Sequence, residues 1–117
     1  MNNRIKGTVA EIAATQYLTE NGFSILECNY SSSKNFQGGE IDIIAKRGGR
    51  IHFIEVKSRT TDKFGTGRES VTAYKQKTIR RMAIKWLVTR GLWDVVPVSL
   101  DIIEINNGII EYYENAF

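Results

Sequence analysis

Two apolar segments joined by a glycine pair constrain this chain more than any other feature of its sequence. Residues 40–45 and 51–58 are rich in isoleucine, valine and phenylalanine, which favour β-strands. Gly48 and Gly49 stand between them, and a glycine pair suits a two-residue hairpin turn because both turn residues need a positive φ. We therefore predict an antiparallel hairpin in which the numbers of paired residues sum to 97.

This register places acidic side chains on one face of the hairpin. Asp42 then lies opposite Glu55, and Glu40 lies opposite Lys57, because side chains alternate between faces along a strand. Directly opposed like charges destabilise a sheet, whereas a divalent cation bound by both carboxylates removes that objection. The other face is expected to be a core face, formed by Ile41, Ile43, Ala45, Ile54 and Val56.

Lys57 adds a third functional group to the acidic face. It lies two residues beyond Glu55 on the same strand, so its ammonium can reach whatever the carboxylates hold. Two carboxylates and a lysine around one point are typical of phosphodiester hydrolysis, in which a metal polarises the phosphoryl group and lysine orients the attacking water. The alternative is a solvated face with a Glu40–Lys57 salt bridge, but unpaired acids are costly in strands apolar enough to be central.

Basic residues are concentrated in the middle of the chain. The whole chain has a net charge of +3, whereas residues 46–90 contain 13 Lys or Arg and only three acids. Residues 92–117 contain five acids and no Lys or Arg. A basic face suits a polyanionic partner, with nucleic acid as the first candidate. A solvated, lysine-rich helix and loop is the alternative.

Composition excludes several classes of protein. The 117 residues, of which 42% are hydrophobic and 25% charged, predict one globular domain spanning 1–117 rather than a disordered chain. No apolar stretch approaches the roughly 20 residues of a membrane span, and no signal peptide is evident, so a cytoplasmic protein without a membrane partner is expected. Cys28 and His52 are the only residues of their types. A disulfide within the chain and a Cys/His zinc site are thereby excluded, and any metal must be held by oxygen.

The remaining elements complete a mixed α/β pattern. Hydrophobic spacing and glycine stops predict an element order α-β-β-β-α-β-β, with a mixed central sheet flanked by helices. The elements outside the hairpin are a helix over 5–21, a strand over 23–30, loops over 31–35 and 59–69, a helix over 72–90, and strands over 98–105 and 109–113. We expect Trp86 and Trp93 to be core anchors and His52 to be a packed or edge residue.

The hairpin motifs resemble those of a known family. Residues 39–44, GEIDII, and 53–59, FIEVKSR, resemble the GEIDLIA…FVEVKTR signature of the YraN-like family of predicted endonucleases. That family is related to archaeal Holliday-junction resolvases and belongs to the PD-(D/E)XK superfamily, whose core is αβββαβ. Further matches in residues 7–18, 64–76 and 100–103 extend the resemblance over nearly the whole chain. The resemblance implies a restriction-endonuclease-like fold with an extra C-terminal hairpin strand.

The resemblance also implies an activity and a site. It implies an endonuclease that depends on Mg²⁺ or Mn²⁺ and hydrolyses DNA, with branched or structured DNA as a candidate substrate. Lys57 would be the catalytic lysine, and Gln76, or its neighbour Lys75, matches a polar position near the site. The implied metal ligands are Asp42, Glu55, Glu11 and Val56.

Candidate nucleic-acid contacts are basic or aromatic residues of the middle segment: Lys46, Arg47, Arg59, Lys63, Phe64, Arg68 and Lys75. Contact with phosphates would dominate, because no helix-turn-helix, zinc finger or RNA-binding aromatic motif is present. Two alternatives remain open. One is a nucleic-acid-binding module of the same fold without cleavage. The other is an interaction protein whose acidic C-terminal edge strand recruits a partner. A second copy of the chain is also a candidate partner.

Overall fold

The computed structural model describes residues 9–31, 39–59 and 71–117. Most of the two predicted loops, the beginning of the first predicted helix, and Lys63, Phe64 and Arg68 lie outside these ranges. No helix in the described part of the chain is long and apolar enough to cross a membrane. The elements are α1 (Val9–Glu20), β1 (Ser24–Tyr30), β2 (Ile41–Arg47), β3 (Arg50–Arg59), α2 (Ala73–Thr89), β4 (Val98–Asn106) and β5 (Ile109–Tyr113).

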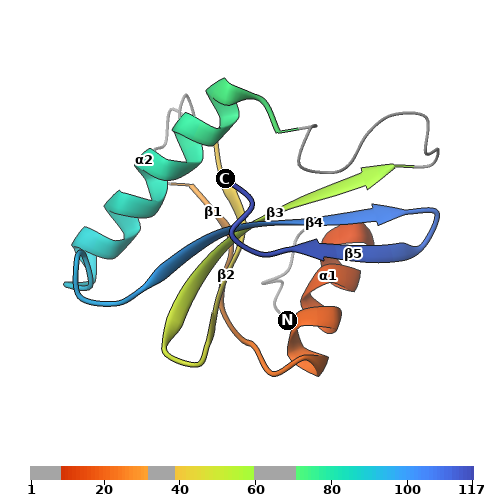
Figure 1. Cartoon of the computed structure of the whole chain (residues 1–117), viewed down its shortest axis with the longest axis horizontal. Coiled ribbons are helices and arrows are strands. Elements are labelled where there is room, and N and C mark those ends of the chain that lie inside the picture. Colours follow the sequence, from red (N-terminus) through yellow and green to blue (C-terminus); the bar gives the residue numbers. More distant parts are fainter. Residues whose placement is uncertain (1–8, 32–38, 60–70) are drawn as a thin grey trace.

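The five strands form one mixed sheet with helices on both of its faces. The strands lie in the order β1-β2-β3-β4-β5, with β3 and β4 parallel and every other neighbouring pair antiparallel. Parallel neighbours need a long crossover connection, and α2 lies in the segment that joins β3 to β4. Figure 1 shows α1 and α2 on opposite sides of the sheet. The predicted αβββαβ core with an additional C-terminal strand is confirmed.

The central hairpin has the predicted turn and register. Gly48 and Gly49 have φ angles of 60° and 80°, in the left-handed region that a two-residue hairpin turn requires. The pairs run from Arg47–Arg50 to Ile43–Ile54, and each sums to 97 as predicted. Pairing between β2 and β3 stops there, although both strands continue beyond it. The register therefore does not extend to the acidic residues.

Both faces of the hairpin are buried, which the sequence did not predict. Ile44 and Phe53 pack beneath α2, whereas Ile43 and Ile54 pack beneath α1. The prediction that Ile41 shares a face with Ile43 is wrong, because Ile41 belongs to the cluster beneath α2. Regular alternation is lost next to Asp42, where the pairing of β2 with β3 has ended.

Helix α2 follows its predicted pattern closely. The Thr72 hydroxyl accepts a hydrogen bond from the Lys75 main-chain N–H at 3.1 Å and so caps the helix start. Gly91, at a φ of 71°, follows the last turn as predicted. The apolar stripe of the helix, which includes Trp86 as predicted, is buried against the sheet: Ile79, Met82, Ala83, Trp86 and Leu87.

One other packing prediction is wrong. Trp93 is 51% exposed, because it lies in the connection between α2 and β4 rather than on the stripe that carries Trp86. On α1, Val9 and Ile12 are exposed, and the buried positions are Ala14, Thr15 and Leu18. Helix α1 therefore contacts the sheet through a narrower face than its apolar residues suggest.

Candidate metal centre

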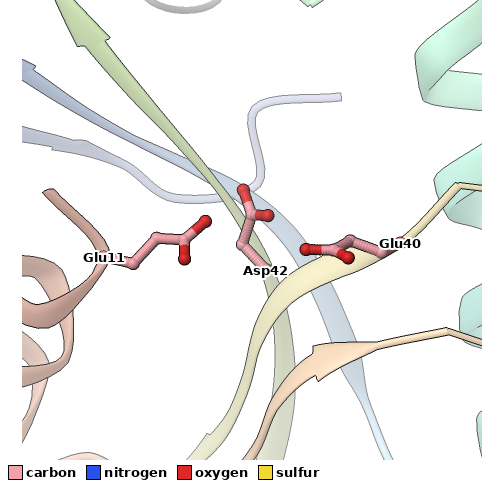
Figure 2. A group of neighbouring side chains, drawn as sticks. All are labelled: Glu11, Glu40 and Asp42. Carbon is pink, nitrogen blue, oxygen red and sulfur yellow. The ribbon is translucent and has the colours of Figure 1, made fainter. Parts of the chain in front are cut away.

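Three carboxylates, one from α1 and two from around the start of β2, converge beside the central strands. Glu11 comes from α1, Glu40 immediately precedes β2, and Asp42 is the second residue of β2. One oxygen of each carboxylate lies within 4.8 Å of the others. Figure 2 shows the Glu11 and Glu40 side chains approaching Asp42 from opposite sides. This arrangement offers three oxygen donors around one point.

The end of the β2–β3 pairing determines where Asp42 lies. Asp42 and Glu55 are not among the paired residues of the two strands. Instead, the main-chain N–H of Val56 donates a hydrogen bond to Oδ2 of Asp42 at 2.8 Å. Asp42 is buried, and this bond satisfies one of its oxygen atoms with the backbone of β3.

The electrostatic environment of Asp42 disfavours its ionised form. Burial, together with the charges of Glu55, Glu11 and Glu40, raises the pKa of this carboxyl to about 8, against the lowering effect of the Val56 hydrogen bond. A carboxyl with such a pKa holds a proton for much of the time at neutral pH. A cation at this point would relieve the same excess of negative charge.

Glu55 provides a second, independent sign of an unfilled interaction. Its side chain is 4% exposed, and Oε2 lies 2.9 Å from the Lys75 ammonium on α2. Oε1 is buried and has no hydrogen-bond partner among the residues that the structure describes. A buried carboxylate oxygen without a partner is costly, and a bound cation would satisfy it. Glu55 lies outside the group of three carboxylates, although its charge acts on Asp42.

These donors fit a hard divalent cation. All the side-chain groups concerned are carboxylates, which suit Mg²⁺ and Mn²⁺ rather than a thiophilic metal. Asp42 and Glu55 were predicted as ligands from the hairpin and Glu11 from the family resemblance, and Asp42 and Glu11 belong to the observed group of carboxylates. Val56 contributes its main-chain N–H to Asp42 in this structure.

The polar residues predicted on α2 occupy different environments. Lys75 contacts Glu55, and the charge and hydrogen bond of Glu55 raise the pKa of the ammonium although burial opposes this. The Gln76 side-chain amide instead donates to the Val71 carbonyl at 3.0 Å, at the beginning of the helix. Lys57 is partly buried on β3, in register with Glu104 of β4.

The basic residues of the hairpin turn do not gather at the carboxylates. Lys46 and Arg47 lie four and five residues along β2 from Asp42, or roughly 13–17 Å at the usual rise of a strand. The Arg47 guanidinium lies over the Phe23 ring, 4.1 Å from its centroid, and donates to the Asn21 carbonyl at 3.1 Å. Arg47 therefore links the hairpin to the α1–β1 connection. The side chain of Arg59 lies outside the described part of the chain.

Two residues of the site were missed or left without a role by the sequence. The Asn29 amide on β1 donates to Glu40 Oε2 at 2.9 Å and to Glu11 Oε1 at 3.5 Å, and so bridges the two acids. Asn29 has a φ of 54°, a conformation that asparagine tolerates better than most residues. Glu40 was recognised in the motif, but its place beside Glu11 depends on packing between α1 and β2, which no local pattern reveals.

A second polar cluster lies on the α1 side of the sheet. Nδ1 of His52 lies 2.7 Å from Oδ2 of Asp101, and both side chains are almost completely buried. The hydroxyls of Ser99 and Tyr112 also donate to Asp101, as does the Asn115 main-chain N–H. Burial alone would raise the pKa of Asp101, but these hydrogen bonds hold it below its ordinary value. The prediction of a packed His52 is confirmed.

Comparison with known proteins places the chain in a family. A family model described as "Uncharacterised protein family UPF0102" matches residues 10–105. A UPF0102 protein of Moorella thermoacetica is 42% identical over 123 residues, covering 100% of this chain and 98% of that protein. One from Thermodesulfovibrio yellowstonii is 42% identical over 111 residues, covering 95% and 94% of the two chains. The chain therefore belongs to UPF0102, the YraN-like family indicated by its motifs.

Proposed function

We propose that this protein is a metal-dependent nuclease that hydrolyses phosphodiester bonds of DNA. The observation that carries the proposal is the convergence of Glu11, Glu40 and Asp42. Oε1 of Glu55, which is buried and has no hydrogen-bond partner in the described part of the chain, supports it independently. Four acids close to one another, without a ligand, would reduce the stability of an ordinary sheet. A divalent cation bound among them would neutralise their charge and explain why these acids lie together.

Mg²⁺ or Mn²⁺ would be held by Asp42, Glu55 and Glu11, with Glu40 close enough to take part. When bound, the cation supplies positive charge that stabilises the charge developing on a phosphoryl group. Asp42 then no longer needs a proton to offset its acidic neighbours, because the cation takes over that role. The Asn29 amide would keep Glu40 and Glu11 oriented through its two hydrogen bonds.

Lys57 is the proposed catalytic lysine. It follows Glu55 by two residues on β3, so in a regular strand both side chains leave the same face. A lysine ammonium beside the carboxylates can donate to a phosphate oxygen and orient the attacking water. The match of residues 53–59 to the family motif supports this assignment.

The charge of α2 supports a polyanionic substrate. The helix contains five Lys or Arg among its 17 residues and no Asp or Glu. Lys77, Arg81 and Lys85 are exposed and follow one another at intervals of four residues, a spacing at which like charges destabilise a helix. A nucleic-acid phosphate backbone would neutralise such a row, and DNA is the proposed substrate through the resemblance to resolvases.

Calorimetric titration with Mn²⁺ tests the metal centre. The wild type should bind Mn²⁺, and Asp42→Asn and Glu11→Gln should each weaken binding by about tenfold or more, the usual range for an altered metal site. Glu20→Gln is the matched control on α1, because Glu20 is exposed and lies outside the group of carboxylates. Its carboxylate accepts a hydrogen bond from the Gln16 side-chain amide instead. Equal Mn²⁺ affinity in all four proteins would remove the site from Asp42 and Glu11.

Cleavage assays test the activity itself. The purified protein should cut at least one member of a panel of junction, flap, single-stranded and duplex DNAs in Mg²⁺ or Mn²⁺, and the activity should elute with the protein. Loss of cutting in Asp42→Asn with retention in Glu20→Gln would assign the activity to this site. DNA binding without cleavage, indifferent to Asp42, would favour a nucleic-acid-binding module instead.

A further inference from the structure

Lys75 occupies an unusual position for a lysine. It lies in the first turn of α2, where the positive end of the helix dipole disfavours a cation. Its Nζ lies 2.9 Å from Oε2 of Glu55, and its side chain is 39% exposed whereas that of Glu55 is 4% exposed. The helix dipole therefore disfavours a lysine at this position. The buried carboxylate of Glu55 favours one, because a buried negative charge needs a positive charge near it.

The same carboxylate belongs to the proposed metal centre. A divalent cation on Asp42 and Glu55 would place two positive charges beside the Lys75 ammonium and take over the neutralisation of Glu55. The ion pair between Lys75 and Glu55 would then lose most of its electrostatic advantage. Lysine is a flexible four-carbon side chain, and one that is 39% exposed has room to move toward solvent.

A displaced ammonium beside the metal centre needs a new anionic partner. The anion that comes to a nuclease site is a substrate phosphate. Metal binding would thus free Lys75 for phosphate, and phosphate binding would in turn free Glu55 for metal. Two ligands that favour the same state of one residue bind with positive coupling, and that coupling is reciprocal.

We propose that Lys75 is a phosphate-binding residue that exchanges Glu55 for a nucleic-acid phosphate when a divalent cation binds. This inference rests on the proposed function and adds to it a cause for coupled binding of metal and substrate. Lys75 contacts the phosphate in this scheme and takes no part in bond breaking.

The first measurement is Mn²⁺ affinity without DNA. Lys75→Met removes the competing cation, so it should bind Mn²⁺ at least about fivefold more tightly than the wild type, within the usual range of coupling between sites. Lys75→Gln should act in the same direction, because it keeps a polar side chain and lacks the charge. Lys77→Met is the matched control, since Lys77 is an exposed lysine of the same helix, and it should leave the affinity within about twofold.

The second measurement is DNA affinity with and without Mn²⁺, by fluorescence anisotropy on a labelled duplex that a gel shows to be intact throughout. Wild-type affinity should increase at least about fivefold with Mn²⁺. Lys77→Met, which lacks one proposed phosphate contact with or without metal, should lower both DNA affinities alike and keep this increase, whereas Lys75→Met should lose most of it. Tighter metal binding is a gain that a damaged fold does not produce, so it separates the proposed role from a structural one.

The outcomes are distinguishable. Unchanged or weaker Mn²⁺ binding by both Lys75 variants, or an undiminished Mn²⁺-dependent gain in DNA affinity, overturns the exchange and leaves the metal centre standing. Absence of Mn²⁺ binding by the wild type overturns the metal centre itself, and the exchange falls with it.

Discussion

The main-chain N–H of Val56 donates to Oδ2 of Asp42 at 2.8 Å, at the point where β2 and β3 have stopped pairing. A regular ladder would have directed that N–H to a carbonyl of the neighbouring strand. The separation of the strands gives it to a carboxylate instead, and Asp42 is held beside Glu11 and Glu40. The irregularity in the sheet is thus what forms the acidic centre.

The burial of Asp42 predicts how stability depends on pH without metal. Its pKa is about 8 in the folded protein, against about 4 for an unperturbed aspartate in the unfolded chain. A group whose pKa is raised by folding stabilises the fold below the unfolded value and loses that contribution as pH rises through the folded value. Urea unfolding in EDTA should therefore show the wild type losing stability relative to Asp42→Asn between about pH 4 and pH 8. Parallel pH profiles would contradict the raised pKa, and Glu20→Gln should follow the wild type.

Substitutions of Lys57 distinguish a nuclease from a binding module that does not cleave. Lys57→Ala should abolish cleavage while retaining most DNA affinity, because losing one phosphate contact among several changes the salt slope by only about one unit. Lys57→Arg should not restore full activity, since arginine stays protonated and has a different geometry. Single-turnover cleavage and anisotropy on the same DNA measure the two properties. Cleavage by Lys57→Ala at nearly the wild-type rate would show that the lysine was wrongly assigned.

The cluster around Asp101 should contribute strongly to stability. Asp101→Asn removes the charged acceptor shared by His52, Ser99 and Tyr112, and leaving buried hydrogen-bonding groups without their partner typically costs about 1–3 kcal/mol, and more for charged groups. Because folding lowers the pKa of Asp101, its contribution is present above about pH 4 and is lost as pH falls through the folded value. The variant should thus show a shallower loss of stability in acid. Asp94→Asn, at an exposed aspartate, is the control and should behave as the wild type.

The two tryptophans should respond differently to substitution. Trp86 is buried, its Nε1 donates to Glu27 at 3.0 Å, and its ring lies edge-on to Phe53. Trp86→Phe should lower the free energy of unfolding by about 2 kcal/mol, from lost packing and the loss of one hydrogen bond to Glu27, which keeps its ion pair with Arg90. Trp93→Phe should change it by less than about 0.5 kcal/mol, because the ring is half exposed. Chemical denaturation followed by circular dichroism compares them, and equal losses would contradict the assignment of Trp86 alone to the core.

Local sequence patterns predicted most of the fold because each element carries its own signal. The Gly48–Gly49 turn determines the hairpin register, and Thr72 and Gly91 delimit α2. The pattern failed where the chain departs from ideal geometry. Alternation assigned Ile41 to the wrong face, because no local pattern shows that the pairing of β2 with β3 ends at the Ile43–Ile54 pair, before it reaches Ile41.

The candidate site was predicted in part, for a similar reason. Asp42 and Glu55 stand out because like charges were expected to face each other across one hairpin. Glu11 came only from family resemblance, and Asn29 had no signal, since both depend on how distant segments pack. The contact of Lys75, rather than Gln76, with Glu55 depends on the rotation of α2 about its axis. Motif matching alone did not decide between the two neighbours.

The carboxylates of the site come from α1 (Glu11), from around the start of β2 (Glu40 and Asp42) and from β3 (Glu55). They therefore meet only when the helix has docked on the completed sheet. An unfolded chain would scatter them and could not reproduce the centre. A cation that binds there is consequently a ligand of the native state alone, and at a free concentration of 100 times its Kd it would add about 2.7 kcal/mol to the free energy of unfolding. Thermal denaturation could then report on occupancy, and a chelator would act on this protein as a mild denaturant.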